Sequence, residues 1–427
     1  MTNTTFARLV RPMPAPHALQ APRRTGVVAL AALLALVGVA PAAGHAQTEP
    51  PPVAQPTALL VSAIGAPLRV PGSDGMTHVE YDLLVANVFT APVTLTAVEV
   101  LDFDAPHSPP LLRIEGDALA ALTESVSVGA PASTAVVPAA GLVATVIDLV
   151  LPPDAVPARV THRIDYTLPP DARAVALIGS RRIDGPELDV DPREPVVLAP
   201  PLRGAGWFAA SGCCLAGGYV APHRSGRMAV DGLRYVKNEA FAIDWVRLRE
   251  GRFAEADGGR NEQHFAFGAE VVAAGAGTVV AVRDGAPEGT PFRLPTTLQG
   301  PSDYSGNKVV VQHGPGVFAT YAHLQPGSIP VRVGDHVAAG VPVGRVGNTG
   351  NSFAPHLHFQ LSDGPDLTTA TSLPFVLDRY DLAGAVALDA LVAALTDPRE
   401  APAMDVVGLN GPETGTHPLL LAVAEFR

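Results

Sequence analysis

The sequence predicts a mainly β protein, built from an N-terminal immunoglobulin-like β-sandwich and a C-terminal domain of antiparallel β-sheet. Three observations lead to this fold class. Short segments that alternate apolar and polar residues recur along the chain, as half-buried strands do. Gly 41 and Pro 43 make up about a fifth of the 427 residues, which favours short strands and many turns. Hydrophobic residues at 47% and charged residues at 16% indicate folded domains rather than disorder.

Charge and lysine content argue against several classes of function. The formal net charge is −12, whereas a protein that binds nucleic acid needs a basic face. The sequence has only two lysines, Lys237 and Lys308, and neither lies in a phosphate-binding P-loop. We therefore expect neither nucleic acid nor nucleotides as partners, and Schiff-base chemistry lacks a plausible lysine.

The first 46 residues have the pattern of a signal peptide. Arginines precede an apolar run over residues 27–40, and small residues lead to a cleavage site after Ala46. The run is short for a membrane span, but an uncleaved anchor stays an alternative, and Arg23-Arg24 fits a twin-arginine signal poorly. Cleavage removes four arginines and no acids, which leaves a formal charge of −16. We expect an exported protein that contacts a membrane only if the signal stays attached.

A Pro-rich spacer, residues 47–57, leads into the predicted sandwich, residues 58–195. Residues 79–85 and 160–168 alternate apolar and polar side chains, and turn residues separate such segments. Several short strands of this kind are typical of an immunoglobulin-like sandwich. Its histidines form no catalytic constellation, so we expect them to pack or to face solvent; they are His78, His107 and His162.

Residues 196–204 are predicted to be a linker, and beyond it the histidines cluster. Seven of the thirteen lie between residues 223 and 358, which suggests a metal site. The sharpest motif is His356-Leu357-His358-Phe359, which follows a turn-rich segment. Alternate side chains of a strand share a face, so the two imidazoles, about 7 Å apart, would face a metal and its water while Leu357 and Phe359 enter the core.

The segment upstream of this motif predicts two rigid strands. Residues 306–324 contain two apolar runs joined by a Gly/Pro turn, and His323 ends the second run. Residues 275–285 and 331–346 repeat the style of short strands and turns. These segments together predict a compact and highly curved β-sheet.

Residues 205–375, about two-fifths of the chain, resemble the lysostaphin-type (LytM-like) zinc metallopeptidases, secreted bacterial endopeptidases that mostly cut peptidoglycan peptides. Five ordered blocks carry the resemblance and are far more specific than a lone His-x-His. The blocks are residues 268–280, 306–324, 334–344, 347–350 and 355–359. The resemblance implies that the C-terminal domain is a lysostaphin-type antiparallel β-sheet metallopeptidase domain, in the periplasm or outside a bacterial cell.

In that family a His, an Asp and the second His of His-x-His hold zinc, while two further histidines serve catalysis. By resemblance, His358 is a zinc ligand, and His356 and His323 form the catalytic pair. The other two ligands are assigned to Asp244, which lies among apolar residues of a predicted strand, and to His223. The resemblance thus implies one zinc ion per chain.

The spacing of the first two ligands departs from the family pattern. Three residues usually separate them, whereas twenty lie between His223 and Asp244. Residues 227–236 predict a strand, an Asp-Gly turn and a second strand, so a hairpin insertion accounts for the difference. His264 is the rival for the first ligand. His313 and His336 fall in predicted turns, where we expect them to be solvated.

The resemblance implies an exported zinc-dependent endopeptidase, whose substrates are peptidoglycan stem or cross-link peptides or Gly-rich peptides. Zinc with three protein ligands keeps a position for water, which His323 and His356 would orient and deprotonate. The main alternative is a catalytically inactive homologue that regulates or binds cell-wall hydrolases. A phosphohistidine sugar-transport carrier conflicts with the export signal, and a biotinyl or lipoyl carrier lacks a suitable lysine.

Two features receive no functional role. Cys213 and Cys214 are adjacent, so they form a vicinal disulfide or stay free thiols, with a soft-metal role as a further alternative. Residues 376–427 are predicted to finish the catalytic domain or to pack on it. Within them, residues 382–395 have helical spacing and residues 419–426 predict a strand.

Overall fold

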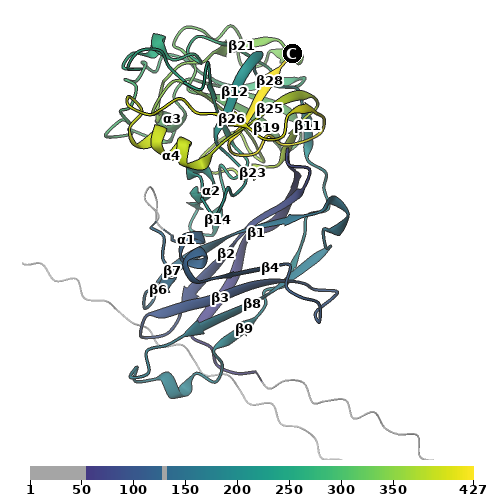
Figure 1. Cartoon of the computed structure of the whole chain (residues 1–427), viewed down its shortest axis with the longest axis vertical. Coiled ribbons are helices and arrows are strands. Elements are labelled where there is room, and N and C mark those ends of the chain that lie inside the picture. The colour runs from purple at the N-terminus through teal and green to yellow at the C-terminus, as the bar shows by residue number, and fades with distance from the viewer. Residues whose placement is uncertain (1–53, 127–131) are drawn as a thin grey trace, which may run out of the picture. The chain divides into compact units, whose positions relative to one another are not determined.

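The computed structural model of the chain describes residues 54–126 and 132–427. This part of the chain is mainly β, as the sequence predicts (Figure 1). The predicted signal peptide, residues 1–46, lies outside the described residues. Within them, no helix has both the length and the apolar character needed to cross a membrane.

Two antiparallel sheets share one apolar core in the N-terminal part. The first sheet has the order β1 (Leu59–Pro71), β2 (Thr77–Asn87), β7 (Leu142–Leu151) and β5 (Thr123–Ser125). The second has the order β10 (Leu188–Asp189), β8 (Arg159–Thr167), β3 (Val93–Asp102) and β4 (Leu112–Glu115), with β6 (Val136–Val137) on β3 and β9 (Arg182–Asp184) on β8. Buried residues of both sheets form one cluster, as in a β-sandwich. The immunoglobulin-like character of this sandwich stays a prediction.

Strand β2 departs from the pattern expected of a half-buried strand. Val79, Tyr81 and Leu83 enter the sandwich core, as their alternation predicts. Glu80 and Asp82, on the opposite face, are 1% and 0% exposed instead of facing solvent. Their cationic partners lie about 140 residues further along the chain, where a local pattern cannot reveal them.

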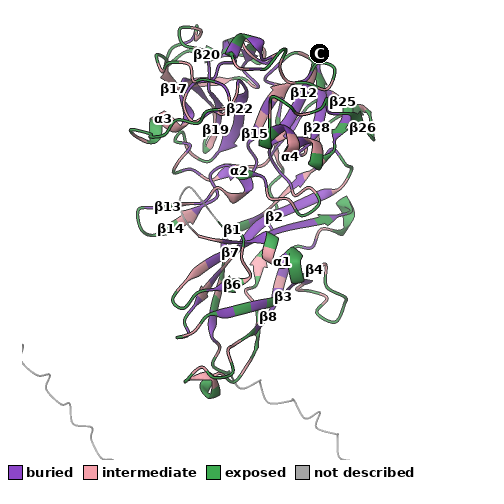
Figure 2. Ribbon diagram, turned by 60° about the vertical axis from the view of Figure 1, so that its left-hand side comes forward, coloured by how far each residue is buried: buried purple, intermediate pink, exposed green. Residues whose placement is uncertain are grey.

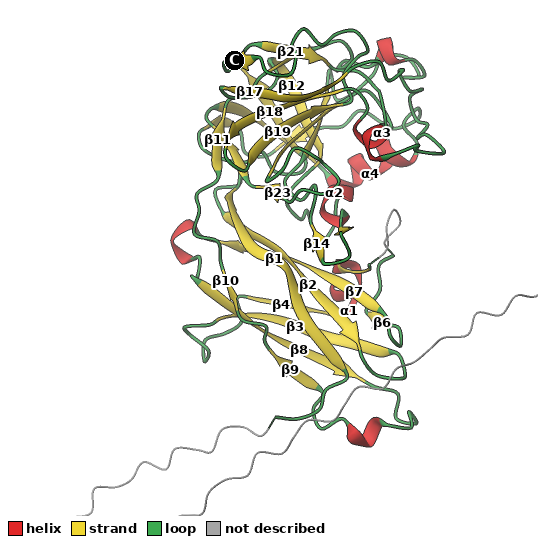
Figure 3. Ribbon diagram, turned by 180° about the vertical axis from the view of Figure 1, so that it is seen from behind, coloured by secondary structure: helices red, strands yellow, loops and turns green. Residues whose placement is uncertain are grey.

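The C-terminal part is built around one large antiparallel sheet (Figure 3). Its order is β20 (His336–Val337), β17 (Gly277–Arg283), β18 (Lys308–Gly314), β19 (Val317–Ala322), β22 (Leu357–Ser362), β15 (Ile243–Arg247), β12 (Gly204–Ser211), β28 (Ala422–Phe426), β25 (Tyr380–Val386) and β26 (Val406–Val407), with β23 (Ser372–Leu373) on β22 and β27 (Gly411–Glu413) on β25. Strands β18 and β19 confirm the two strands predicted over residues 306–324.

Shorter elements complete this part. Three strand pairs lie outside the large sheet: β11 (Val196–Leu198) with β24 (Phe375–Leu377), β13 (Met228–Val230) with β14 (Arg234–Val236), and β16 (Glu270–Val272) with β21 (Pro342–Arg345). The described helices of the C-terminal part are α2 (Pro222–Ser225), α3 (Pro301–Ser305), α4 (Leu388–Thr396) and the 3₁₀ turn Asn261–Gln263. Those of the sandwich are α1 (Gly116–Leu122) and the 3₁₀ turns Pro153–Ala155 and Val175–Leu177.

Two segments differ from their predicted structure. Residues 196–204, expected as a linker, include β11, which pairs in parallel with β24 because its apolar residues join the domain core. The helix expected over residues 382–395 begins only at Leu388. The residues before it belong to β25, whose burial alternates with a period of two, and β25 pairs with β28 inside the large sheet. Residues 376–427 thus contribute strands to that sheet.

The central strands of the large sheet have an apolar face that forms the domain core. Trp245 of β15, Tyr321 of β19 and Leu357 and Phe359 of β22 belong to one buried cluster. Figure 2 shows β15, β19 and β22 together in this part of the molecule. Since side chains alternate along a strand, the intervening residues of these strands project from the opposite face.

Candidate metal centre

The register of three neighbouring strands brings four predicted site residues together. Asp244 of β15 lies opposite His358 of β22, and His358 in turn lies opposite Ala322 of β19. His323 directly follows β19, and His356 directly precedes β22. The four side chains therefore meet near the same end of these strands, on the face opposite the apolar core.

Asp244 lies at the centre of a group of possible metal ligands. Its Oδ1 is 3.1 Å from Nδ1 of His358, and its Oδ2 is 3.2 Å from Nε2 of His223. One ligand atom from each of the three residues lies within 4.8 Å of the others. Tetrahedral zinc, with bonds of about 2.0–2.1 Å, needs ligand atoms about 3.3 Å apart. Two imidazole nitrogens and one carboxylate oxygen at these distances fit a zinc ion.

A hydrogen-bonded chain fixes the orientation of the His358 ring. Gln360 donates its amide N–H to the carbonyl of Asn238 at 3.1 Å, so its side-chain oxygen is free to accept. Nε2 of His358 lies 3.0 Å from that oxygen and donates to it. A neutral imidazole with its proton on Nε2 keeps the Nδ1 lone pair for a metal.

His223 comes from outside the large sheet. It lies on the short helix α2, and the hairpin of β13 and β14 follows it before the chain enters β15. The predicted hairpin insertion is therefore present. The rival residue, His264, donates from Nε2 to the carbonyl of Gly258 at 2.8 Å and stacks on Phe253. It is not part of the ligand group.

His323 and His356 lie next to each other beside this group, with ring centroids 4.6 Å apart. His323 Nδ1 is 2.7 Å from the carbonyl of Thr349, and His356 Nδ1 is 2.7 Å from the carbonyl of Ala354. A carbonyl only accepts hydrogen bonds, so both rings carry a proton on Nδ1. Nε2 is therefore the nitrogen that each ring turns toward the ligand group. Nε2 of His356 lies 3.3 Å from Oδ1 of Asp244; burial would lower the pKa of His356, but this carboxylate raises it.

Tight backbone contacts hold the carbonyl that orients His323. His323 itself has a positive φ of 61°, which is rare for a residue with a Cβ and concentrates at functional sites. A Cβ on Gly306 would lie 2.4 Å from Thr349 O, and a Cβ on Gly350 would lie 2.4 Å from Gly306 N. Glycine is required at both positions because the two loops approach backbone to backbone.

The charges of the site are strongly coupled. Burial by itself would raise the pKa of Asp244, but the facing His223 and His356 hold it well below its ordinary value. Burial lowers the pKa of His323 well below its ordinary value, and the neighbouring His356 and His358 lower it further. Asp244 is thus an anion, and His323 is a neutral imidazole.

Several contributors to the site were not singled out from the sequence. Gln360 lies two residues beyond His358 on β22. Because alternate residues of a strand share a face, the sequence could have placed Gln360 beside His358. Thr349 lies in a block of the family resemblance without an assigned role. Glu239 and Tyr304 had no local signal: Glu239 lies 4.0 Å from His358 Nε2 and accepts a hydrogen bond of 3.0 Å from the Tyr304 hydroxyl.

The other histidines of the C-terminal part lie outside the cluster. His313 is half-buried at the end of β18, with Nδ1 2.8 Å from Ala276 O. His336 is exposed in β20 and contacts Thr278. Both belong to strands rather than to the predicted turns.

The group of possible ligands thus lies on one face of an antiparallel sheet, opposite the apolar core. Residues 263–368 match the model of peptidase family M23, so the predicted family is confirmed for this domain.

Curated relatives match shorter segments of the chain. The DD-carboxypeptidase/endopeptidase Mpg of Neisseria meningitidis serogroup B is 39% identical over 79 residues, which are 18% of this chain and 18% of that protein. The peptidoglycan DD-endopeptidase ShyA of Vibrio cholerae is 45% identical over 58 residues, 14% of this chain and 13% of that protein. The chain thus matches less than a fifth of the length of these relatives. The catalytic domain of lysostaphin from Staphylococcus simulans aligns at 23% identity with a TM-score of 0.21, over 34% of this chain and 83% of its own.

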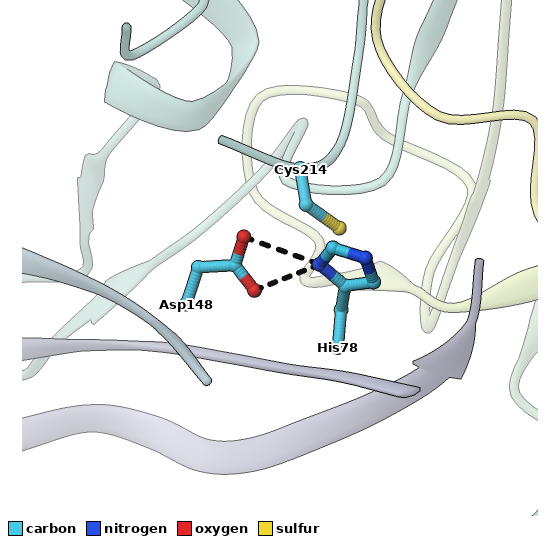
Figure 4. Close-up of side chains that lie close together, drawn as sticks. All are labelled: His78, Asp148 and Cys214. Atoms are coloured by element: carbon cyan, nitrogen blue, oxygen red, sulfur yellow. Dashed lines mark hydrogen bonds and ion pairs between the residues drawn. The ribbon is translucent and has the colours of Figure 1, made fainter. Parts of the chain in front are cut away.

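A second group of metal-binding residue types surrounds the cysteines (Figure 4). Cys213 and Cys214 form the vicinal disulfide that was one of the alternatives from the sequence. His78 Nδ1 lies 2.9 Å from Asp148, and its Nε2 lies 3.2 Å from Asp74. Burial would lower the pKa of His78, but these two carboxylates raise it to about 10. The ring nitrogens of a doubly paired histidine cation have no free lone pair, and a disulfide lacks the thiolate that binds metals, so this group is a poor metal site.

We predict that Gly306→Ala destabilises the fold more than Gly316→Ala does. Both glycines have a positive φ, 60° at Gly306 and 68° at Gly316, so a side chain is disfavoured at either position. Only at Gly306 would the new Cβ meet backbone atoms; nothing lies within 4 Å at Gly316. The excess loss should be about 1–3 kcal/mol, measured by urea unfolding with Trp207 and Trp245 fluorescence. Equal losses would contradict the close approach of the loops.

We also predict a pH-dependent stability from His78. A histidine whose pKa rises from 6.5 to about 10 on folding stabilises the protein fully below pH 6.5, and the effect disappears as the pH rises through 10. His78→Gln should therefore lower the free energy of unfolding on the order of 3–5 kcal/mol at pH 6, and much less at pH 10.5. The exposed His107 supplies the control, since His107→Gln should show no such trend. A pH-independent loss in His78→Gln would contradict the ion pairs.

Proposed function

We propose that this chain is an exported zinc-dependent endopeptidase that hydrolyses peptide bonds in peptidoglycan stem or cross-link peptides. The observation that carries the proposal is the group of His223, Asp244 and His358 within 4.8 Å of one another, with His323 and His356 beside it. Two imidazoles and one carboxylate are a typical ligand set for catalytic zinc.

His223, Asp244 and His358 would hold the metal, one zinc ion per chain. Zinc bound there supplies Lewis acidity, which polarises a scissile carbonyl and makes water nucleophilic near neutral pH. Gln360 keeps the Nδ1 lone pair of His358 directed at the ion. One carboxylate among the ligands leaves the loaded site with a net positive charge, which favours a developing oxyanion.

His323 and His356 handle the protons in this proposal. The carbonyls of Thr349 and Ala354 hold their Nδ1 protons, so each ring presents Nε2 as the atom that accepts or returns a proton. One ring orients and deprotonates the attacking water, and a ring must also protonate the leaving amine. Two adjacent imidazoles suffice for both tasks.

Peptidoglycan is the proposed substrate because the matched relatives are named for it or for endopeptidase activity. The apolar run at residues 27–40 supports export to the compartment where that substrate lies. Gly-rich peptides are the second class to test, as the resemblance implies.

We predict different outcomes for the two histidines of His-x-His. His358→Ala should lose both zinc and peptidase activity, whereas His356→Ala should keep about one zinc per chain and lose activity by a factor of about 10² or more. The measurements are metal content of the purified mature chain, residues 47–427, and hydrolysis of peptidoglycan peptides.

His336→Ala, which changes an exposed histidine outside the cluster, is the matched control and should match the wild type. Equal zinc loss in the His356 and His358 variants would refute the division of roles. A wild-type chain that binds no zinc when offered it would instead favour a catalytically inactive, regulatory homologue.

A further inference from the structure

Three acidic residues of the sandwich are buried against three basic residues of the segment between His223 and Asp244. Together they form a cluster, here called the charge network, in which no residue is more than 7% exposed. Its members are Glu80 and Asp82 of β2, Glu124 of β5, and Arg224, Arg227 and Lys237 of residues 221–237.

Asp82 is the centre of the charge network because it contacts all three cations. Its Oδ1 accepts from Arg224 at 3.2 Å and lies 3.5 Å from Lys237 Nζ, while its Oδ2 accepts from Arg227 at 2.7 Å. Burial would raise the pKa of Asp82, but the three cations hold it far below its ordinary value. Asp82 is therefore an anion in the folded protein.

The other members extend these contacts. Arg224 also forms an ion pair with Glu80, and Arg227 donates to Glu124 at 2.8 Å. Ser225, between the two arginines, donates its hydroxyl to Glu124 at 2.7 Å. Helix α2 is thus joined to both β2 and β5 of the sandwich, and Figure 2 shows α2 and β13–β14 beside β1 and β2.

Neither side of the charge network can be buried alone. If the three carboxylates were buried without the three cations, or the cations without the carboxylates, uncompensated charge would remain in a dry environment. Such a charge is strongly destabilising. The two sides therefore fix each other's position. Of the three acids, Asp82 contacts all three cations, so the fixation depends most on Asp82.

His223 depends on these contacts more than the other ligands do. Asp244 and His358 lie on paired strands of the large sheet, whereas α2 has only four residues and belongs to no sheet. A helix of one turn has too few internal hydrogen bonds to hold its own shape. The two residues that follow His223, Arg224 and Ser225, both bind carboxylates of the sandwich.

We infer that the sandwich positions the metal ligand His223 through the charge network, with Asp82 as the central positioning residue. The long insertion between His223 and Asp244 supplies the cations for this attachment. The sandwich is then part of the metal centre's supporting structure rather than a separate module. This inference rests on the proposed function, since it takes His223 as a zinc ligand.

The test is the zinc affinity of the full chain carrying Asp82→Asn, a change that keeps the side-chain shape and removes the charge. Loss of a group that orients a ligand costs about tenfold to hundredfold in metal affinity, and we expect a loss in that range by competition with a chromophoric chelator. The visible spectrum of the Co²⁺-loaded protein should also change, because it reports ligand geometry.

Glu99→Gln is the matched control. Glu99 is also a buried sandwich carboxylate paired with two arginines, Arg113 and Arg163, but it lies on β3 in the other sheet. Glu99→Gln should lower the stability of the sandwich while keeping wild-type zinc affinity and the wild-type Co²⁺ spectrum. If both Asp82→Asn and Glu99→Gln lose zinc affinity, general destabilisation explains the loss, and the inference is overturned.

Wild-type zinc affinity in a folded Asp82→Asn protein would overturn the inference and leave the proposed function intact. A wild-type chain that binds no zinc would contradict both. If Asp82→Asn does not fold, Ser225→Ala decides: it keeps every charge and removes one bond to Glu124. A several-fold loss of zinc affinity then supports the inference, and an unchanged affinity overturns it.

Discussion

The pairing of β15 with β22 is the constraint on which the site depends. It sets Asp244 opposite His358 while Trp245 lies opposite Leu357 in the apolar core. A slip of β15 by one residue would turn Asp244 into the core and expose Trp245, at a large cost in buried apolar surface. The hydrophobic face of the sheet thus fixes the polar face. Nearly every other group is placed relative to Asp244: His358 and His356 face its Oδ1, and His223 faces its Oδ2.

Local patterns were enough to predict this central part of the fold. The period of two in His356-Leu357-His358-Phe359 and the apolar residues around Asp244 give the direction of each side chain on its strand. The Gly/Pro turn between β18 and β19 gives the hairpin that brings His323 to the same place. Such inferences succeed because strand periodicity, turn residues and the fold agree with one another. The family resemblance then supplied the roles.

Contacts between distant parts of the chain escaped prediction for a physical reason. The acidic side chains of β2 alternate with apolar ones as on a solvent-facing strand, and only Arg224, Arg227 and Lys237 make their burial possible. The role of Thr349 depends likewise on a backbone carbonyl, which carries no signature in residue type. The start of α4 was misplaced because β25 and the following helix are both rich in Ala and Leu, and the pairing partner β28 lies near the end of the chain.

The order in which the chain is synthesised affects when the acids of the charge network lose their water. The strands with Glu80, Asp82 and Glu124 precede their cationic partners by 100 residues or more. A sandwich that folds first leaves these carboxylates in water, where they cost nothing. Their dehydration is then deferred until residues 221–237 are made and dock, and the same segment carries His223. The placement of His223 is in this way tied to the folding of a domain made before it.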